Sequence, residues 1–524
     1  MLIIHPPLTK ACEPPAPLAY LFAFVKKHGH PCSICDMNIE GMHYLFANAG
    51  TSTDTWSKRA VKNIGRNLEA MQNKRLYANI DRYKRSVSDL NRVLQNKGEQ
   101  YNLQLSLANY QDNTLSPLKS KDLIYAATTY QDNIFFPYFA KRLEELIENN
   151  NTRHIGFSLG YLSQALCTFA MIGFLKSRLP DIKIIVGGGL VTTWLSRTQW
   201  HNPFTDLVDH FIPGRGEEPL LRILGTSSDF KQLKPDYKPL FTNNYLSPGF
   251  ILPYAASTGC FWKKCSFCPE TSEDNPYLHV APNRVIDDLK KLKKETNPSL
   301  IHFLDNAINP ATLTALTNSP LHTPWYGFAR IDPQLADLVF CKQLRLSGCI
   351  MLKLGLESGD QDVLDNMNKG IDLELAATVL HNLEQAGIAT YVYLLFGTPT
   401  EDHDRADKTL DFVITHHRAI TYLNHAIFNM PVDSREHLNL VISNFYTGDL
   451  TIYHNFTHPK GWTRGKIRRY LETTFKRSPK IAEIVQRNPP FFTSNHAPFF
   501  TSKSFNTNVF ESAYPDKGQQ ATIK

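Results

Sequence analysis

Residues 259–269 read GCFWKKCSFCP, and this stretch marks the start of the chain's second structural unit. It holds Cys260, Cys265 and Cys268 at the spacing C-x4-C-x2-C, directly after Tyr254–Ser257, an apolar segment typical of a strand. Three thiolates on one short loop repel one another unless a metal holds them together. Free cysteines rarely cluster in a loop by chance, so the spacing predicts a metal site at the end of a strand.

The residues near this loop leave two kinds of metal site open. Lys263 and Lys264 are expected to offset part of the thiolate charge and to lower the thiol pKa values. Structural zinc needs four closed ligands, and His279 could complete such a set. An iron–sulfur cluster held by three thiolates instead keeps one iron open for a substrate or cofactor, which is a catalytic arrangement.

Strands and helices alternate after the loop, and this alternation predicts a parallel sheet. Six strands joined by five helices over residues 251–430 are typical of a partial (βα)6 barrel of the TIM type. The predicted strands are Tyr254–Ser257, Leu300–Leu304, Trp325–Ala329, Ile350–Leu356, Ala389–Phe396 and Tyr422–Phe428. The predicted helices are Arg284–Glu295, Pro310–Leu316, Pro333–Leu346, Leu373–Gln385 and Arg405–Thr415.

Polar side chains follow four of these strands, at the carboxyl ends where barrel enzymes carry out their chemistry. Each alone is compatible with a strand-end cap or a salt bridge. Together, above one cysteine loop, an acid, a base and a carboxylate beside glycine suit a zwitterionic ligand. The residues are Asp305, Asn306, Arg330, Asp332, Glu357, Ser358, Gly359, Gly397, Thr398 and Pro399.

The first 227 residues alternate in the same way, which predicts a doubly wound, Rossmann-like parallel sheet. Its predicted strands are Leu2–Ile4, Pro31–Met37, His154–Leu159, Ile182–Val186 and Leu207–Ile212, and its predicted helices are Leu18–Lys27, Phe139–Glu148 and Ala165–Arg178. Glycines at three strand ends would let a ligand approach the backbone closely, although they also suit plain turns. These glycines are Gly160, Gly187, Gly188, Gly189 and Gly214.

A basic helical insertion, at about residues 52–130, interrupts this first unit. Between Lys58 and Lys97 eleven residues are basic and three are acidic; the whole chain has a net charge of +7, so the rest sums to −1. The pattern predicts an amphipathic helix with solvated charges, and a contact surface for an acidic partner or RNA is the alternative. The predicted buried face comprises Leu76, Ile80, Tyr83, Val87, Leu90 and Leu94.

Composition excludes several classes of protein. Hydrophobic residues make up 42% of the 524 residues and charged residues 20%, which excludes a globally disordered chain. Outside the insertion no charge excess indicates general nucleic-acid binding. No apolar run approaches the roughly 18 residues of a membrane span, and the first residues lack a signal peptide's features. The nine cysteines are an odd number, so we expect reduced thiols and a cytoplasmic location.

The cysteines outside the loop are expected to pack in the core. Cys32 and Cys35 are three residues apart in a predicted strand and so face opposite sides, which disfavours a metal or redox pair. Cys341 lies in a predicted helix and Cys349 at a strand start, where thiols act as small apolar groups.

Two further segments complete the expected domain organisation. Residues 228–250 are rich in Pro, Asp, Asn and Lys and predict a linker. Residues 431–524 form a small C-terminal extension, with a helix at Lys466–Lys476 that we expect to cap the barrel. The last twenty residues are expected to be disordered.

The second unit resembles the radical S-adenosylmethionine (radical SAM) family over about residues 250–430. The loop at Cys260–Cys268 is similar to the family's signature loop, including the aromatic Phe267 before the last cysteine, although the usual first gap is three residues rather than four. Residues 354–370 (LGLESGDQDVLDNMNKG) are similar to the family's fourth-strand segment, and residues 395–402 (LFGTPTED) to its fifth.

The resemblance implies that Cys260, Cys265 and Cys268 ligate a [4Fe-4S] cluster whose fourth iron binds the amino and carboxylate groups of S-adenosylmethionine. One electron, from a reductant such as flavodoxin or ferredoxin, would cleave this ligand to methionine and a 5′-deoxyadenosyl radical. The implied contacts are Asp305 to the methionine amino group, Arg330 to its carboxylate, Glu357 and Ser358 to the ribose or methionine part, and the backbone near Phe267 to adenine.

Residues 1–50 and 140–225 resemble the cobalamin-binding domain found ahead of many radical SAM cores. The family's cobalt-ligating motif Asp-x-His-x-x-Gly is missing, and residues 36–41 (DMNIEG) imitate it with Asn38 in place of His, after the second strand rather than the first. The resemblance implies either cobalamin with an unligated lower face or a cofactor fold without its cofactor. The matching pieces are Pro6 and Pro7, Gly29 and His30, Ser158 to Gly160, Gly187 to Gly189, and Gly214 to Glu218.

The leading hypothesis is a cytoplasmic radical SAM enzyme with a cobalamin-binding-type domain, acting on a small-molecule or peptide substrate. Its expected reaction is methylation of an unactivated carbon or another radical rearrangement. One alternative is a non-catalytic zinc-binding adaptor closed by His279, with the basic helix as docking surface. The other is a radical SAM enzyme without cobalamin, whose first unit docks the substrate.

Overall fold

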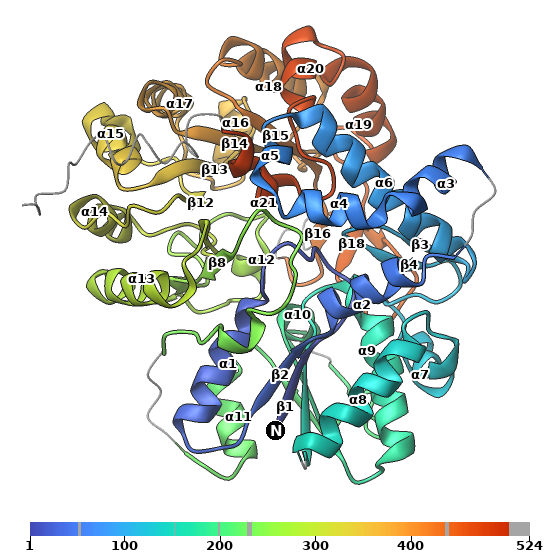
Figure 1. Cartoon of the computed structure of the whole chain (residues 1–524). Coiled ribbons are helices and arrows are strands. Elements are labelled where there is room, and N and C mark those ends of the chain that lie inside the picture. Colours follow the sequence, from blue (N-terminus) through green and yellow to red (C-terminus); the bar gives the residue numbers. More distant parts are fainter. Residues whose placement is uncertain (51–53, 151, 198–199, 228–232, 435–439, 502–524) are drawn as a thin grey trace, which may run out of the picture.

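The computed structural model contains two parallel sheets, one above the other, each accompanied by helices (Figure 1). It describes residues 1–50, 54–150, 152–197, 200–227, 233–434 and 440–501. The smaller sheet lies within the first predicted unit and the larger sheet within the second. The predicted α/β class with two parallel sheets is therefore confirmed.

The smaller sheet has five parallel strands in the order β2-β1-β5-β6-β7. Helices cover both of its faces, with α1 and α11 on one side and α8 and α9 on the other, which is the predicted doubly wound arrangement (Figure 1). The strands are β1 (Leu2–His5), β2 (Ser33–Asp36), β5 (His154–Ser158), β6 (Lys183–Gly187) and β7 (His210–Ile212). The helices are α1 (Ala16–Lys27), α2 (Met37–Ala47), α8 (Phe136–Asn150), α9 (Leu162–Arg178), α10 (Gly189–Leu195) and α11 (Glu217–Ile223).

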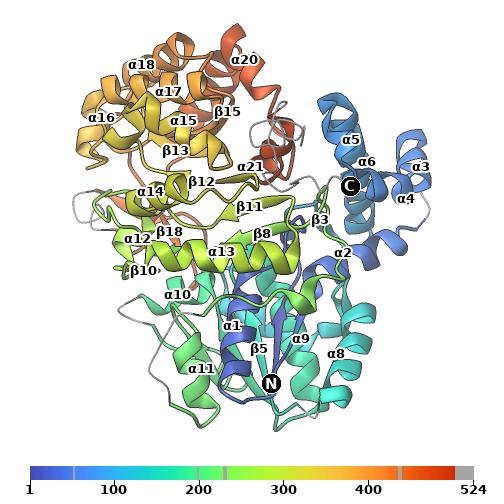
Figure 2. The same ribbon diagram turned by 60° about the vertical axis from the view of Figure 1, so that its left-hand side comes forward.

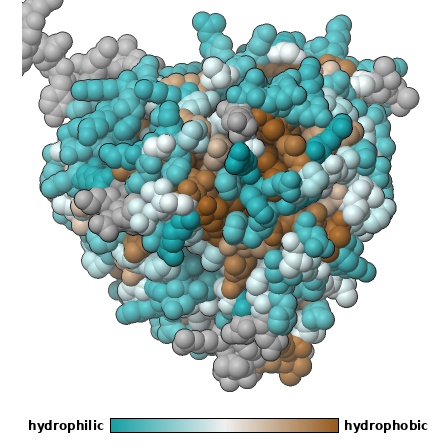
Figure 3. Space-filling model, turned by 90° about the horizontal axis from the view of Figure 1, so that it is seen from below, coloured by the Kyte–Doolittle hydropathy of each residue, from teal (hydrophilic) through white to brown (hydrophobic). Residues whose placement is uncertain are grey.

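The strands of this sheet are apolar because helices cover both faces. Ile155 and Phe157 of β5, for example, are buried. Figure 3 looks at this unit from below, toward the end where β1 begins, and shows apolar residues gathered in the middle of that face, with hydrophilic residues around them.

The basic insertion is helical, as predicted, but its long helix is broken once. Asn79 accepts hydrogen bonds from the backbone N–H groups of Asp81 and Arg82 and so starts a new helix in the predicted run. Beyond this break Tyr83, Val87, Leu90 and Leu94 are all buried, as predicted, whereas Leu76 and Ile80 of the predicted face are half-buried. The elements are α3 (Thr55–Lys62), α4 (Ile64–Met71), α5 (Lys74–Tyr77), α6 (Ile80–Glu99), the hairpin β3 (Leu103–Leu105) and β4 (Tyr110–Asp112), and α7 (Ser120–Thr128).

The larger sheet has six parallel strands in the order β15-β14-β13-β12-β11-β8, so that strands successive in the chain are neighbours. A helix follows along each connection between them (Figure 2). The strands are β8 (Ile251–Tyr254), β11 (Leu300–Phe303), β12 (Trp325–Ala329), β13 (Cys349–Glu357), β14 (Ala389–Phe396) and β15 (Tyr422–Ile427). The helices are α13 (Pro282–Thr296), α14 (Pro310–Asn318), α15 (Leu338–Leu346), α16 (Gln361–Asn366), α17 (Leu373–Ala386) and α18 (His403–Thr415).

Alternate residues of this sheet belong to two different cores. Leu352 and Val392 pack with the surrounding helices in one cluster. Met351 and Tyr391 join the cluster that extends into the first unit. One face of the larger sheet is therefore covered by its own helices, and the other is turned toward the N-terminal part of the chain.

Two predicted elements of the second unit need correction. The strand expected at Tyr254–Ser257 ends at Tyr254, and β9 (Ser257–Thr258) pairs antiparallel with β10 (Leu278–His279). The helix expected at Pro333–Leu346 is a 3-10 turn, Pro333–Ala336, followed by α15. The break follows from Asp337, whose carboxylate accepts from the N–H of Val339 and starts a new helix. The short α16 was not predicted.

The C-terminal extension holds a small sheet and several short helices. The predicted helix at Lys466–Lys476 is present as α19 followed by a π-helical turn. The elements are β16 (Met430–Pro431), β17 (Ile442–Asn444), β18 (Tyr453–Phe456), α19 (Arg464–Tyr470), the turn Leu471–Phe475, α20 (Pro479–Val485), α21 (Thr493–His496) and a 3-10 turn at Ala497–Phe500. Residues 228–232 of the predicted linker and the last twenty residues, expected to be disordered, lie outside the described ranges; the rest of the linker contains a 3-10 turn at Lys238–Leu240.

One C-terminal segment, residues 493–500, joins three parts of the molecule. Tyr422 of β15 donates a hydrogen bond to the carbonyl of Ala497 (3.1 Å). The Tyr83 hydroxyl of the insertion lies 2.8 Å from Nδ1 of His496. Asn495 donates to Glu13 of the loop between β1 and α1 (3.3 Å).

Every helix in the described part of the chain is too short or too polar to span a lipid bilayer.

Candidate iron–sulfur and cofactor site

The cysteine loop lies between β9 and the short helix α12 (Pro269–Ser272), next to the carboxyl end of β8. Gly259 begins it with a positive φ of 74°, and a Cβ atom there would stand 2.4 Å from the carbonyl oxygen of Pro276. Ser266 donates its backbone N–H to Met367 O (3.0 Å), and Trp262 Nε1 donates to Asn368 O (3.2 Å). The loop is thus held against the segment after β13.

The thiols of Cys260, Cys265 and Cys268 lie within electrostatic reach of one another. Burial, with smaller contributions from Cys265 and Cys260, raises the pKa of Cys268 to about 11. Burial also raises the pKa of Cys265, against the lowering effect of Lys369 and Arg330. All three thiols are free, as are the other six cysteines.

This donor set fits an iron–sulfur cluster. No three His, Cys, Asp or Glu side chains in the described ranges are arranged to hold a single ion. A cluster distributes its thiolate ligands over separate iron atoms, and nearby cations stabilise its negative charge. His279, the fourth ligand of the zinc hypothesis, is exposed and stacks on Tyr277 with ring centres 5.6 Å apart.

Arg330, at the end of β12, lies against the cysteine loop as expected. Its guanidinium carbon is 3.7 Å from the ring centre of Trp262, and it donates hydrogen bonds to the backbone carbonyls of Lys369 and Gly370. Gly370 leaves room for this stack, because a Cβ there would lie 2.3 Å from Cζ2 of Trp262. The arginine is therefore positioned before any ligand binds.

Glu357 and Phe267 are brought together through one lysine. Lys369 pairs with the Glu357 carboxylate at 2.7 Å, and its ammonium lies 5.4 Å from the ring centre of Phe267. Glu357 has a positive φ of 70°, an uncommon conformation for a residue with a side chain. Strain of this kind concentrates at functional sites.

Asp305 and Ser358 are buried, and both bond to the protein itself. Asp305 accepts hydrogen bonds from the N–H of Ala256 (3.1 Å) and the hydroxyl of Ser257 (2.5 Å), and burial raises its pKa to about 6. Ser358 Oγ lies 3.2 Å from the hydroxyl of Thr409. In this structure both side chains shape the backbone around the site, and their contacts to S-adenosylmethionine remain predictions.

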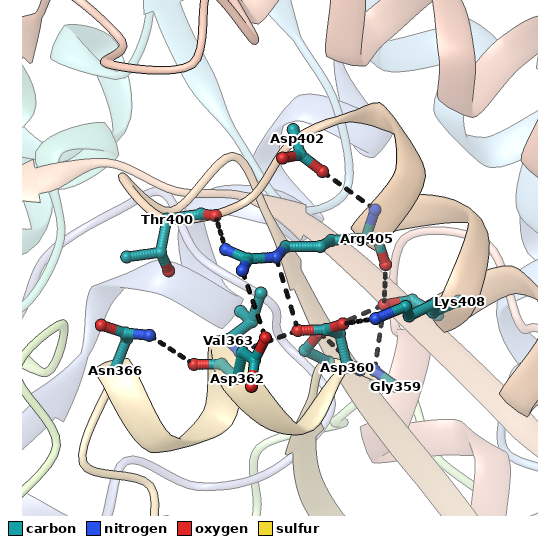
Figure 4. A network of polar contacts seen from close by, with 11 residues as sticks. Gly359, Asp360, Asp362, Val363, Asn366, Thr400, Asp402, Arg405 and Lys408 are labelled. Atoms are coloured by element: carbon teal, nitrogen blue, oxygen red, sulfur yellow. Dashed lines mark hydrogen bonds and ion pairs between the residues drawn. The ribbon is translucent and has the colours of Figure 1, made fainter.

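Asp360 anchors the segment after β13 (Figure 4). Its side chain is 1% exposed and accepts from the N–H of Val363 (2.9 Å) and from Nζ of Lys408 (2.6 Å). Arg405 lies 3.8 Å from the same carboxylate and 3.2 Å from that of Asp362. These bonds fix the short helix α16 to α18 and so hold the rim that carries Glu357.

The glycines of the first unit and the residues on either side of the three cysteines, Thr258, Gly259, Pro269 and Glu270, line one cavity of about 1210 Å³. This volume is somewhat above the usual range for small-molecule sites, as a large cofactor requires. Thr258 Oγ1 and Glu270 Oε2, on either side of the cysteines, also line it and are buried without a hydrogen-bond partner among the described residues. Buried polar atoms normally have partners, so these two suit a polar ligand. The predicted glycines on its wall are Gly160, Gly187, Gly188, Gly189 and Gly214.

The glycines serve different purposes. Gly188 has a φ of 115°, and a Cβ would stand 2.5 Å from Leu159 O, so its own backbone requires glycine. A Cβ at Gly160 would meet only the side chain of Gln164 at 3.7 Å, and one at Gly214, whose φ of 63° also favours glycine, would meet nothing within 4 Å. These two positions keep the cavity wall free of side chains, as the cofactor hypothesis expects.

Residues 36–41, which imitate the cobalamin motif, make hydrogen bonds within the protein itself. Asp36 caps α2 and accepts a hydrogen bond from Tyr245 (2.9 Å). Asn38 is buried and accepts from the N–H of Thr9 (2.8 Å). Cys35 is 3% exposed, as the core-packing prediction expects, whereas Cys32 is half-buried.

Sequence reasoning missed a second polar group on the cavity, formed by Glu13, His302 and Lys353. His302 Nδ1 lies 2.9 Å from Glu13 Oε1, and Lys353 Nζ lies 3.0 Å from His302 Nε2. The signal was available: His302 and Lys353 are polar residues inside otherwise apolar strands. Their partner Glu13 lies 289 residues before His302, so no local pattern could reveal it.

No protein-family model matches the chain. One curated protein, the bacteriochlorophyllide d C-12(1)-methyltransferase of Chlorobaculum tepidum, is 26% identical over 176 residues, which are 31% of this chain and 37% of that protein. The chain thus spans well under half of the curated relative that it matches.

Two solved structures share the fold over most of the chain. The cobalamin-dependent S-adenosylmethionine radical enzyme OxsB, with aqua-cobalamin bound, has a TM-score of 0.56 at 12% identity and covers 88% of this chain and 64% of its own. The radical S-adenosylmethionine methyltransferase TsrM from Kitasatospora setae, with tryptophan and a SAM analogue bound, has a TM-score of 0.50 at 13% identity and covers 82% and 73%. The resemblance to radical SAM enzymes with a cobalamin-binding-type domain is therefore confirmed at the level of the fold.

Proposed function

We propose that this chain is a radical SAM enzyme whose cluster is held by Cys260, Cys265 and Cys268. When bound and reduced, the [4Fe-4S] group would supply one electron for cleavage of S-adenosylmethionine to methionine and a 5′-deoxyadenosyl radical. The observation that carries the proposal is that the residues flanking the three cysteines and the glycine-rich edge of the first sheet line one cavity.

The residues around the loop would bind and orient S-adenosylmethionine. Arg330, stacked on Trp262, presents a fixed cation for a carboxylate. Phe267 offers an aromatic surface beside Lys369 and Glu357 for the nucleoside part. The cavity would shield a reactive radical from water, because its walls come from both sheets.

We further propose that cobalamin occupies the part of the cavity lined by Gly160, Gly187–Gly189 and Gly214, and that the reaction is methylation of an unactivated carbon. The support is the fold shared with OxsB and TsrM and the curated methyltransferase relative. Residues 36–41 would supply no side-chain ligand to this cofactor, since Asn38 is buried and engaged by the N–H of Thr9. A flavodoxin- or ferredoxin-type protein would supply the electron, and the substrate would be a small molecule or peptide.

Anaerobic reconstitution with iron and sulfide tests the cluster. The wild-type protein is expected to bind about four irons and four sulfides and to form 5′-deoxyadenosine when reduced. Cys265→Ala should lose both properties, whereas the matched variant Cys341→Ala should keep them, because Cys341 is a buried thiol in α15. One bound zinc without labile sulfide, or an active Cys265→Ala variant, would overturn the assignment.

The ratio of two products tests methyl transfer. A cobalamin-dependent methyltransferase that uses a radical is expected to form S-adenosylhomocysteine together with 5′-deoxyadenosine once hydroxocobalamin and a substrate are present. Formation of 5′-deoxyadenosine alone, with no cobalamin retained after gel filtration, would assign the chain to cobalamin-independent radical chemistry.

A further inference from the structure

A buried charged network lies on the same cavity, away from the cysteine loop. Glu13, in the loop between β1 and α1, accepts from His302 Nδ1 (2.9 Å) and from Asn495 Nδ2 (3.3 Å). On the other side of the imidazole, Lys353 Nζ donates to His302 Nε2 (3.0 Å). Glu13, His302 and Asn495 all line the cavity, and Lys353 stands behind His302. The network therefore borders the space available to a ligand.

A second ammonium group joins this network. Lys10 lines the cavity and donates a hydrogen bond to Thr493 Oγ1 (2.7 Å). Burial lowers the pKa of Lys10 and lowers that of Lys353 to about 8; Glu13 opposes both shifts, so that both side chains are still largely protonated at neutral pH. The neighbouring thiol of Cys12 stays neutral, because burial raises its pKa well above the usual value.

The charges of this network do not balance. His302 is buried, which lowers its pKa and keeps the imidazole neutral. Two ammonium groups then face one carboxylate, which leaves one positive charge in excess. Lys353 is only 5% exposed, so water cannot solvate it freely. A buried charge without a counter-ion is costly, and proteins normally pair it.

Aromatic side chains pack behind the network, and one apolar side chain lines the cavity beside it. His302 stacks on Tyr326 with ring centres 4.3 Å apart and an interplanar angle of 7°. The Lys353 ammonium lies 4.3 Å from the ring centre of Phe328. Leu304, directly after the end of β11, is 37% exposed and lines the cavity. A ligand here would find one excess positive charge beside apolar surface.

We propose that this end of the cavity binds the carboxylate of the substrate, and that the substrate is a carboxylic acid with an apolar body. Lys10 and the Glu13–His302–Lys353 network supply the positive field, and Leu304 offers apolar surface for that body. The inference rests on the proposed function, because it takes the cavity as the place where the substrate meets the cofactors. The inference adds the chemical class of the substrate, which the proposed function does not specify.

Calorimetric titration of the reconstituted full-length protein with benzoate and with benzamide tests the proposal. The two probes have the same ring and nearly the same shape, but only benzoate is charged. Benzoate is expected to bind at least about tenfold more tightly than benzamide, which is the effect of one charge-assisted contact. Lys10→Met and Lys353→Met should each abolish this preference, and Lys10→Arg should retain it. Lys62→Met, on the exposed surface of α3, is the matched control and should behave as wild type.

Equal affinity for benzoate and benzamide would overturn the proposal, as would a preference for benzoate that survives in both Lys10→Met and Lys353→Met. The proposal would also fail if benzoate binding were lost when hydroxocobalamin or S-adenosylmethionine is added. The last result would assign the counter-ion to an anionic group of a cofactor. Iron and sulfide are measured on the same samples. A protein without a cluster contradicts the proposed function, whereas a protein with a cluster and no preference for benzoate contradicts the substrate class alone.

Discussion

The guanidinium carbon of Arg330 lies 3.7 Å from the centre of the Trp262 indole ring. The two residues come from different segments, the end of β12 and the cysteine loop, so this stack ties the predicted carboxylate-binding cation to the predicted cluster ligands. Lysine cannot reproduce it, because its ammonium is a point charge without a planar face.

Arg330→Lys is accordingly expected to weaken S-adenosylmethionine binding by about tenfold to a hundredfold, through loss of the paired N–H donors and of the stack. Trp262→Leu should weaken binding by about tenfold while leaving the charge in place. Equilibrium dialysis of the reconstituted proteins measures both effects. The control is Arg222→Lys, which alters an exposed pair with Glu218; if all three variants bind alike, the assigned role of Arg330 is wrong.

Asp360 is predicted to stabilise the rim of the site through its buried charge. Asp360→Asn keeps a side chain that can cap α16 but removes the charge-assisted bond from Lys408, so we expect the free energy of unfolding to fall by about 1–2 kcal/mol. Asp362→Asn alters a carboxylate that is 67% exposed and should cost under about 0.5 kcal/mol. Urea unfolding measures both variants, and equal losses would contradict this reading of Figure 4.

Gly160→Leu tests whether the glycine-rich edge faces a cofactor. The position has room for a side chain, so the variant should fold while its side chain enters the cavity. Affinity for hydroxocobalamin, followed by absorbance, is expected to fall at least about tenfold, since the leucine competes for the same volume. Gly65→Leu in α4, where a Cβ also meets nothing within 4 Å, is the control. Unchanged affinity in Gly160→Leu would place any cobalamin elsewhere.

The buried carboxyl group of Glu401 is expected to make the free energy of unfolding depend on pH. Burial raises its pKa to about 8, although Gly397 N and Trp462 Nε1 donate hydrogen bonds to it. A carboxyl group in the unfolded chain has a pKa of about 4.3, so between about pH 4.5 and 8 the folded protein binds the proton more tightly. Stability must then fall as pH rises through this window, by up to about 1.4 kcal/mol per pH unit from this group.

Glu401→Gln cannot titrate and keeps one acceptor oxygen, so its free energy of unfolding should fall less steeply with pH than that of the wild type. Urea unfolding at pH 5, 6.5 and 8 compares the slopes. Glu374→Gln, an exposed change in the first turn of α17, should retain the wild-type slope. Parallel curves for wild type and Glu401→Gln would show that Glu401 is already ionised in the folded protein.

The elements that could be predicted are those whose signal is local. The strands of the larger sheet are runs of apolar residues between glycines and prolines, and β12 and β14 have the predicted bounds. The cysteine loop could be read from its spacing alone. Caps were harder: Asn79 and Asp337 each divide a run of helical residues, because a side-chain oxygen satisfies the first free N–H groups of a new helix.

The parts that could not be predicted depend on contacts between distant residues. Lys369 pairs with Glu357, only twelve residues earlier in the chain. The aromatic ring that the Lys369 ammonium lies over belongs to Phe267, in the distant cysteine loop. Asn495 contacts Glu13 across 482 residues of sequence. Alternation and spacing say which residues share a face, but not which faces of separate units meet.

The contacts of residues 493–500 bear on how the protein is made. Glu13 is translated long before Asn495, and Tyr83 long before His496. During synthesis these two early side chains therefore lack their hydrogen-bond partners. The two sheets can form as their strands emerge, whereas the wall between them closes only after translation has passed residue 500. A nascent chain shorter than this would lack the contacts that residues 493–500 make with Glu13, Tyr83 and Tyr422.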